Sequence, residues 1–221
     1  MHRAIVPLTL AALAILLSTA RSAEKDIPEG FEALFNGKDL KGWKVYGGKI
    51  EAWGVDNGLL FTTGSGGGWL LTEKEYGDFE LRLEYRWEKA GGNSGVALRS
   101  PLTGDVSTKG IEIQLIDDAG YEKVHKYKLK PTQHTGSIYD VVPPSKLPGK
   151  GAGEWNKMRI VAKGRKITVE LNGETVTDAN LDDYKTHTEK HPGLLRPKGH
   201  LGVQSHGGRV EFRKLFVKER G

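Results

Sequence analysis

The sequence predicts an all-β protein built as an antiparallel sandwich or barrel. Residues 78–88 alternate apolar and charged side chains with a period of two, as expected for a strand with one buried face. The 30 glycines among 221 residues show no collagen period and indicate many tight turns. No segment shows the apolar periodicity of an amphipathic helix of three turns. Together these observations favour many short strands joined by tight turns.

Strand-like segments follow one another at short intervals along the chain. Asn57-Gly58 and Asn172-Gly173 favour two-residue hairpin turns, because both positions of such a turn need a positive φ. In the alternating segment, the apolar face is expected in the core and the charged face in solvent. The predicted strands are residues 31–35, 43–46, 51–55, 59–62, 69–72, 78–88, 95–99, 111–116, 155–162, 166–171, 201–205 and 209–217.

The N-terminal segment differs from the rest of the chain. A short positive start precedes an apolar run over residues 4–17, and small residues follow it. The run is too short for a membrane span, which needs about 20 residues, but it suits a signal peptide. We therefore expect residues 1–22 to be a signal peptide, with cleavage after Ala20 or Ser22, and residues 23–221 to form a single β-sandwich domain. The mature protein is expected in the periplasm or outside the cell, without a membrane contact.

Composition excludes several classes of function. The absence of cysteine excludes disulfides, thiolate zinc sites, iron–sulfur clusters and cysteine nucleophiles. The net charge of +5 is mild and the charges are interspersed, so nucleic acid is not an expected partner. Neither a phosphate-binding glycine motif nor a nucleophile-elbow pentapeptide occurs. Catalysis would have to come from carboxylate, His, Tyr or Arg side chains, or from a hard metal ion.

Two strand segments carry polar residues opposite their apolar ones. In residues 111–116 three aliphatic side chains share one face, so Glu112 and Gln114 point together to the other face, about 7 Å apart. In residues 95–99 the same alternation places Arg99 away from the core. The stretch 117–154, which has the poorest strand signal, follows the first of these segments, and structureless insertions of that length are usually functional loops. These features predict a candidate site.

A series of short motifs runs from residue 31 to residue 219, nearly the whole mature chain, and their order and spacing are similar to those of a known family. They are Asn36-Gly37-Lys38-Asp39-Leu40 with Gly42-Trp43, Asp78-Phe79-Glu80-Leu81, Gly92-Asn93-Ser94-Gly95-Val96, Glu112-Ile113-Gln114 with Asp117-Asp118, Thr135-Gly136-Ser137-Ile138-Tyr139, Glu154-Trp155-Asn156, Leu171-Asn172-Gly173, and residues 199–206 leading to Phe212-Arg213. In this order they resemble the 3-keto-disaccharide hydrolase domain family.

This resemblance implies a concanavalin-like jelly-roll β-sandwich of the lectin and glucanase type, with a carbohydrate site on its concave face. It also implies cleavage of glycosides already oxidised at C3 by 1,2-elimination, followed in some members by hydration of the resulting 2-hydroxyglucal. The expected partner is accordingly a small oxidised glycoside or disaccharide.

Such a reaction needs a base near C2, a stabiliser for the enolate oxygen and an acid for the leaving group. Glu112 is the candidate base, with His206 as the alternative base or as the leaving-group acid. Arg99, or a metal ion held by carboxylate and His groups, is a candidate stabiliser of the enolate. Tyr139 is a further candidate proton donor.

Substrate binding needs polar groups for hydroxyls and an apolar face for the sugar ring. Gln114 and Asn93 are candidates for the hydroxyls, and Trp69 is a candidate for stacking on the ring. Asp117 is a further candidate for substrate binding. With Asp118 and Glu122 it could instead coordinate a divalent cation through hard oxygens, the one cofactor that the sequence suggests.

Two other functions compete with this interpretation. A conventional retaining glycosidase needs two carboxylates about 5.5 Å apart. Gln114 stands where the second carboxylate of a Glu112 pair would be, which disfavours ordinary hydrolysis. A noncatalytic carbohydrate-binding module would need only aromatic platforms and polar groups that bind hydroxyls, and it is the alternative from another class.

Overall fold

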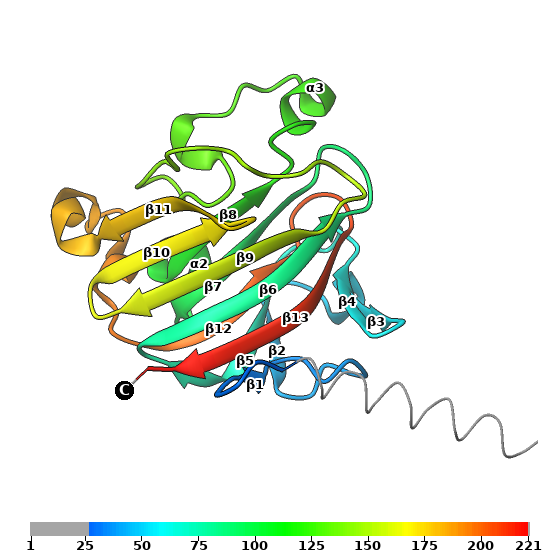
Figure 1. The fold of residues 1–221 in the computed structure, drawn as a ribbon, viewed down its shortest axis with the longest axis horizontal. Coiled ribbons are helices and arrows are strands. Elements are labelled where there is room, and N and C mark those ends of the chain that lie inside the picture. Colours follow the sequence, from blue (N-terminus) through cyan, green and yellow to red (C-terminus); the bar gives the residue numbers. More distant parts are fainter. Residues whose placement is uncertain (1–26, 221) are drawn as a thin grey trace, which may run out of the picture.

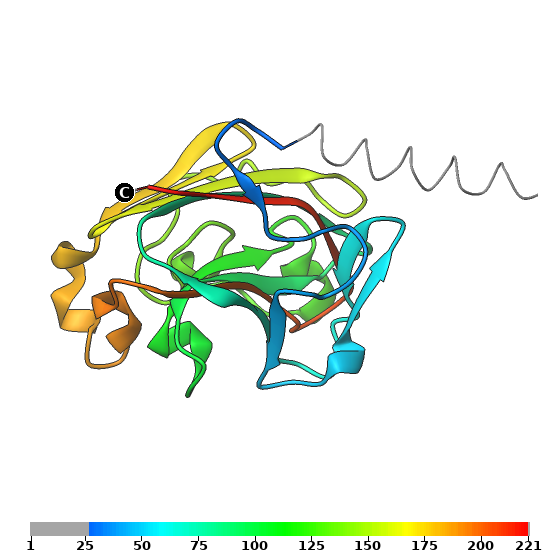
Figure 2. The same ribbon diagram turned by 90° about the horizontal axis from the view of Figure 1, so that it is seen from below.

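Two antiparallel sheets pack face to face in the computed structural model, which describes residues 27–220. Figure 2 shows the sheets as two layers, and the prediction of an all-β sandwich is confirmed. The larger sheet has the order β11-β10-β9-β6-β13-β4-β3, with β1 paired to β13 (Figure 1). The smaller sheet has the order β2-β5-β12-β7-β8. The predicted signal peptide, residues 1–22, lies outside the described residues.

The elements have the following bounds. The eight-stranded sheet contains β1 (Glu32–Ala33), β3 (Trp53–Asp56), β4 (Leu59–Thr62), β6 (Phe79–Trp87), β9 (Asn156–Lys163), β10 (Lys166–Leu171), β11 (Glu174–Asn180) and β13 (Val210–Glu219). The five-stranded sheet contains β2 (Trp43–Tyr46), β5 (Trp69–Tyr76), β7 (Asn93–Ser100), β8 (Ile111–Ile116) and β12 (Gly199–Gln204). The helical turns are η1 (Ile50–Ala52), α2 (Val106–Lys109), α3 (Tyr121–His125), η2 (Pro131–Gln133), η3 (Leu181–His187) and η4 (Pro192–Leu195).

The alternation of β6 places its apolar residues in the core between the sheets, as predicted. The charged face of β6 is not simply solvated, however. Glu80 is only 2% exposed, because arginine side chains from β6, β9 and the C-terminal end cover its carboxylate. The buried apolar residues of the strand are Phe79, Leu81, Leu83, Tyr85 and Trp87.

Strand β11 was not among the predicted strands. Its residues, Glu174–Asn180, are mostly polar and lack a run of apolar side chains. The strand forms because the Asn172-Gly173 turn folds the chain back along β10, where backbone hydrogen bonds pair the two strands. A local pattern of side chains therefore could not reveal it.

The stretch 117–154 carries α3 and η2 but no named strand, and α3 lies at one end of the sandwich (Figure 1). Part of the outer face of the five-stranded sheet is covered by α2. Val106 of this helix packs on Trp69, Leu71 and Ala97 and forms a small apolar cluster separate from the main core. Within residues 27–220, no helix is long and apolar enough to cross a membrane.

Candidate active site

The register between β7 and β8 sets the position of the two polar residues predicted to face away from the core. Glu112 pairs with Ala97, and Gln114 pairs with Gly95. Directly paired residues lie side by side on one face of a sheet, so each polar side chain has a very small neighbour, Ala97 for Glu112 and Gly95 for Gln114. A Cβ atom built on Gly95 would stand 2.2 Å from Oε1 of Glu112. The glycine therefore provides the space that the carboxyl group occupies.

A cavity of about 220 Å³ opens on this outer face of the five-stranded sheet. It collects side chains from β7, α2, β8, the long loop and the end of β12, which are far apart in the sequence. Five of the eight residues proposed from the sequence lie here together. The cavity is lined by Asn93, Ser107, Glu112, Gln114, Tyr139, Gln204 and His206.

The loop that follows β8 returns alongside it and brings Tyr139 to the cavity. The backbone N–H of Gly136 donates to the carbonyl of Gln114 at 2.9 Å, and that of Tyr139 donates to the carbonyl of Glu112, also at 2.9 Å. Ile138 forms an isolated bridge with Ile113 between these bonds. Residues 136–139 thus extend the sheet beyond its edge strand, which fixes Tyr139 opposite Glu112.

The end of β12 is held against the start of β7. Asn93 and Gly207 exchange two backbone hydrogen bonds, of 2.7 and 3.0 Å, and the Ser94 hydroxyl donates to the Gln204 carbonyl at 2.7 Å. These bonds place Gln204 and His206 beside Asn93. The Asn93 side chain in turn accepts a hydrogen bond from the Gln114 amide at 3.2 Å.

Glu112 is a buried carboxyl without a partner. It is 4% exposed, and its carboxyl forms no ion pair or hydrogen bond with any residue in the described part of the chain. Burial raises the pKa of Glu112 to about 8, and the negative charge of Asp105 adds to the effect. A carboxyl group with this pKa is a much stronger base than an ordinary glutamate when it is ionised.

The other ionisable group at the cavity that has a shifted pKa is His206. The residue is exposed at the rim of the cavity, but protein atoms packed against the ring shield it partly from water. This partial desolvation disfavours the charged imidazolium and lowers the pKa of His206. Its imidazole is therefore mainly neutral at pH 7, with one nitrogen as a donor and the other as an acceptor.

Arg99 does not lie at the cavity, so its proposed role at the enolate is wrong. Between the pairs Ala97–Gly202 and Ser100–His200, β7 has one residue more than β12, and Arg99 adopts a φ of 49° in this bulge. The bulge interrupts the alternation from which the outward direction was predicted. The buried guanidinium instead donates to the carbonyls of Gly77 and Gly164 and pairs with Asp78 at 3.0 Å.

Trp69 pairs with Gln204 in the sheet and so lies on the same face as the cavity, but it does not line it. It is 6% exposed and packs on Leu71, Ala97 and Val106 under α2. Its predicted stacking on a sugar ring is wrong, because the ring is already covered by protein. The residue supports the wall of the site instead.

Asp117 also lies away from the cavity, so its predicted contact with substrate is wrong. Its Oδ2 accepts a hydrogen bond from the backbone N–H of Gly91 at 2.9 Å, which ties the turn before β7 to the loop. The cation site suggested with Asp118 and Glu122 does not form. Asp118 pairs with His134 at 2.9 Å, and Glu122 accepts from a backbone N–H. No three His, Cys, Asp or Glu side chains among residues 27–220 converge as metal ligands.

The cavity also contains Gln204 and Ser107, which were not among the predicted site residues. Oε1 of Gln204 is buried and has no hydrogen-bond partner among the described residues. The alternation of residues 201–205 contained a signal for Gln204, because Leu201 and Val203 face the core. Ser107 had no such signal. It is held at the cavity by Asp105, which caps α2 and accepts from the Ser107 backbone N–H and hydroxyl at 3.0 and 2.8 Å.

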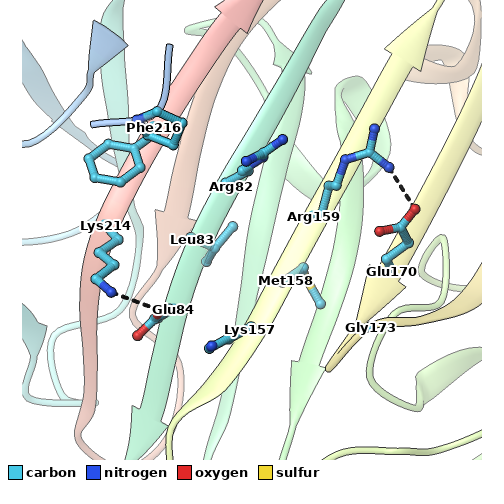
Figure 3. Close-up of a pocket in the computed structure, with 11 residues that line it drawn as sticks. Arg82, Leu83, Glu84, Lys157, Met158, Arg159, Glu170, Gly173, Lys214 and Phe216 are labelled. Atoms are coloured by element: carbon cyan, nitrogen blue, oxygen red, sulfur yellow. Dashed lines mark hydrogen bonds and ion pairs between the residues drawn. The ribbon is translucent and has the colours of Figure 1, made fainter. Parts of the chain in front are cut away.

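A larger cavity, of about 370 Å³, crosses the outer face of the eight-stranded sheet (Figure 3). Its carboxylates are already paired. Glu84 binds Arg213 and Lys214, and Glu170 binds Arg159 at 2.6 Å. A base or acid held in an ion pair is poorly suited to proton transfer, so the smaller cavity around Glu112 is the better candidate for an active site.

Comparison with known proteins identifies the family of the chain rather than the individual residues of this site. Residues 30–218 match the model of the 3-keto-alpha-glucoside-1,2-lyase-like domain family. The chain belongs to this family. The resemblance noted in the sequence motifs is thereby confirmed, and the match spans nearly all of the described residues.

Individual relatives are similar over most of their length. The chain is 27% identical over 232 residues to a 3-keto-disaccharide hydrolase from Bacteroides thetaiotaomicron, with 86% of this chain and 78% of that protein covered. A candidate glycosyl hydrolase from Parabacteroides distasonis has a crystal structure with a TM-score of 0.77 and 30% identity, covering 87% of this chain and 95% of the other. The carbohydrate-binding module CBM66 from Bacillus subtilis shares the fold, with a TM-score of 0.57, 14% identity, and 82% and 98% of the two chains covered.

Proposed function

We propose that this protein is a glycoside-hydrolase-like enzyme that cleaves glycosides oxidised at C3 by 1,2-elimination, with hydration of the product completing a net hydrolysis. The family and the relative from Bacteroides thetaiotaomicron support this substrate class. The observation that carries the chemistry is the unpartnered, buried carboxyl of Glu112 in a cavity of otherwise neutral polar groups.

The ketone at C3 acidifies the proton on C2, so the first step needs a base rather than a strong acid. Glu112 removes this proton. Its raised pKa, about 8, makes the ionised carboxylate a strong base while leaving a useful fraction ionised near neutral pH. An ordinary hydrolase would need a second carboxylate, and Glu112 is the only Asp or Glu among the residues that line the cavity.

The remaining groups have complementary roles. His206, which is mainly neutral, donates a hydrogen bond to the enolate oxygen, as a neutral imidazole can do without losing its proton. Asn93, Gln114 and Gln204 bind sugar hydroxyls. Tyr139 gives a proton to the leaving oxygen at C1. These polar groups suit one hydroxylated ring, which a cavity of about 220 Å³ can hold.

A noncatalytic binding module is the competing function, since CBM66 shares the fold. A module that binds sugars by stacking needs an exposed aromatic platform, but Trp69 is packed under α2 and does not line the cavity. Burial of an unpaired carboxyl costs stability, and a site that only binds hydroxyls could use a neutral amide in its place, whereas abstraction of the C2 proton needs a base. Both points favour the enzyme.

The test compares an alkyl 3-keto-glucoside with the same glucoside not oxidised at C3. We expect release of the alcohol and a transient absorbing enone from the oxidised compound alone. Deuterium at C2 should slow the reaction and be lost to solvent. Release of alcohol from both compounds would indicate ordinary hydrolysis, and binding of the oxidised compound without any product would indicate a binding module.

We also propose that the protein is exported and cleaved near residue 22, on the basis of its N-terminal sequence. Expression of the full chain in a Gram-negative host, with intact-mass measurement of the periplasmic fraction, tests this. A protein that keeps all 221 residues in the cytoplasm would contradict it.

A further inference from the structure

Gln133, a residue that does not line the cavity, forms one hydrogen bond to Tyr139 and two further hydrogen bonds within the loop, each of fixed direction. Its Nε2 donates to the Tyr139 hydroxyl oxygen at 3.4 Å. Its Oε1 accepts from the backbone N–H of Lys130 at 2.9 Å and from the Tyr127 hydroxyl at 3.2 Å. The side chain therefore uses both ends of its amide inside the loop.

The bond to Lys130 decides which end of the amide is which. A backbone N–H can only donate, so the atom of Gln133 that faces it must be the oxygen. The atom that faces Tyr139 is then the NH₂ group, which can only donate. The Tyr139 oxygen accepts this bond, and its own hydrogen is not used by Gln133.

The surrounding backbone holds this arrangement in place. Gln133 ends η2, where Pro131 fixes the first turn and the Gln133 side chain accepts a hydrogen bond from the backbone N–H of Lys130, the residue before the helix. Tyr139 is held on the other side by its backbone bond to β8. Both partners thus sit on ordered segments, and the free hydrogen of Tyr139 is available to the cavity that its side chain lines.

We propose that Gln133 is a positioning residue that keeps Tyr139 as the proton donor of the cavity. This proposal rests on the proposed function. In the elimination, Glu112 takes the C2 proton, and the electron pair of that C–H bond forms the enolate. When the ketone re-forms, the C1–C2 double bond forms and the C1–O bond breaks. The leaving oxygen takes the proton of Tyr139, which is restored from solvent while Glu112 releases its own.

The decisive variant is Gln133→Glu. A carboxylate keeps an oxygen for the Lys130 N–H and the Tyr127 hydroxyl, so the loop retains those two bonds. Its second oxygen is an acceptor where the NH₂ group was a donor, and it binds the hydrogen of Tyr139. The proton is then directed away from the cavity. Tyr139→Phe is the reference variant, because it removes the proton altogether.

The readout is the dependence of kcat on the leaving group. An alkyl 3-keto-glucoside needs an acid to leave, whereas the 4-nitrophenyl compound leaves as a stable anion. We expect Tyr139→Phe to lower kcat about 100-fold on the alkyl compound and less than about threefold on the nitrophenyl compound. Gln133→Glu should show the same contrast with a loss of about tenfold, and the double variant should be no slower than Tyr139→Phe.

Tyr127→Phe is the matched control, because it removes one bond to Gln133 and leaves the Lys130 bond that sets the direction. It should stay within about twofold of the parent protein on both compounds. Equal losses on both substrates for Gln133→Glu, no loss at all, or an additive double variant would overturn the positioning role. If the parent protein releases the leaving group from neither compound, the proposed function is wrong. That result is distinct from the results above, which concern only the role of Gln133.

Discussion

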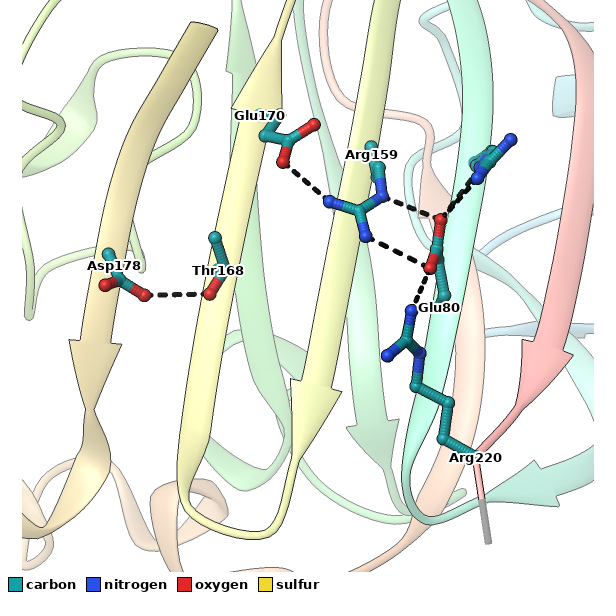
Figure 4. Close-up of polar contacts among 7 residues, drawn as sticks. Glu80, Arg159, Thr168, Glu170, Asp178 and Arg220 are labelled. Carbon is teal, nitrogen blue, oxygen red and sulfur yellow. Dashed lines mark hydrogen bonds and ion pairs between the residues drawn. The ribbon is translucent and has the colours of Figure 1, made fainter. Parts of the chain in front are cut away.

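Two glutamates on the outer faces of the two sheets are almost equally buried but have opposite surroundings. Glu80, on β6, is 2% exposed and binds Arg82, Arg159 and Arg220. Figure 4 shows its bonds to Arg159 and Arg220. Burial by itself would raise the pKa of Glu80, but these hydrogen bonds outweigh it and lower the pKa to about 2. Glu112, on β8, is 4% exposed, has no such partner, and its pKa is raised to about 8.

The comparison shows that burial alone does not identify a functional carboxyl. Around Glu80 the cations make the charged form the favoured one, so the residue contributes to the fold and cannot exchange protons near neutral pH. Around Glu112 no cation stabilises the charged form, which lowers the stability of the fold when the carboxyl is ionised. With a pKa of about 8, the carboxyl can both gain and lose a proton near neutral pH. An uncompensated buried acid facing a cavity is characteristic of a site kept for chemistry at a cost in stability.

Replacement of the proposed base should have the largest effect. Glu112→Gln keeps the shape of the side chain and removes its basicity, so we expect kcat on a 3-keto-glucoside to fall about 10²–10⁴-fold. Glu80→Gln is the matched control and should stay within about twofold when assayed as folded protein. Unchanged turnover in Glu112→Gln would exclude Glu112 as the base.

The pH dependence should be the next largest effect. If kcat/KM requires the ionised carboxylate of Glu112, it should rise about tenfold per pH unit up to about pH 8 and then level off. At pH 6 it would lie about 100-fold below the plateau. A plateau that begins near pH 5 would show that the essential carboxyl has an ordinary pKa, and would contradict the comparison with Glu80.

Stability should respond in the opposite sense at the two glutamates. The lowered pKa of Glu80 means that its contribution is full above about pH 4.5 and is lost as pH falls through about 2. We expect Glu80→Gln to lower the free energy of unfolding by about 2 kcal/mol at pH 7 in urea titrations. This is less than the cost of breaking a fully buried pair, because the three arginines are partly exposed.

The raised pKa of Glu112 has the reverse consequence. The parent protein loses stability as pH rises from about 4.5 through about 8, because the carboxyl must then ionise without a partner. Glu112→Gln should therefore unfold at a higher temperature than the parent protein at pH 9 and at the same temperature at pH 4. A destabilised Glu112→Gln at pH 9 would indicate that the carboxylate has a partner in solution.

The smallest predicted effect concerns the space under the carboxyl. Gly95→Ala would place a Cβ atom 2.2 Å from Oε1 of Glu112, and the flexible side chain would have to move. We expect kcat/KM to fall about tenfold with little change in stability, since displacement of a catalytic group by about 1 Å already lowers rates. Gly77→Ala is the control, because its nearest contact would be an ordinary 3.6 Å. Equal kinetics in the two variants would show that Gly95 does not set the position of Glu112.

Local patterns predicted the strands whose side chains alternate. β6 and β8 were found because one face of each strand is apolar, and this also revealed the shared direction of Glu112 and Gln114. The same reasoning failed at Arg99, where the bulge in β7 breaks the alternation. Gln204 was not predicted either: the alternation in β12 gives its outward direction, but its place at the site depends on β12 lying beside β7.

The amino-acid sequence by itself determined the sandwich class, the family and most of the cavity-lining residues, since these follow from side-chain periodicity and from motifs along the chain. Tertiary structure decided which buried charges have partners. Glu80 and Glu112 both follow an apolar residue on a strand, and the local difference between them is the residue two positions on, Arg82 after Glu80 and Gln114 after Glu112. The other two arginines that neutralise Glu80, Arg159 of β9 and Arg220 at the C-terminal end, reach it only in the folded chain.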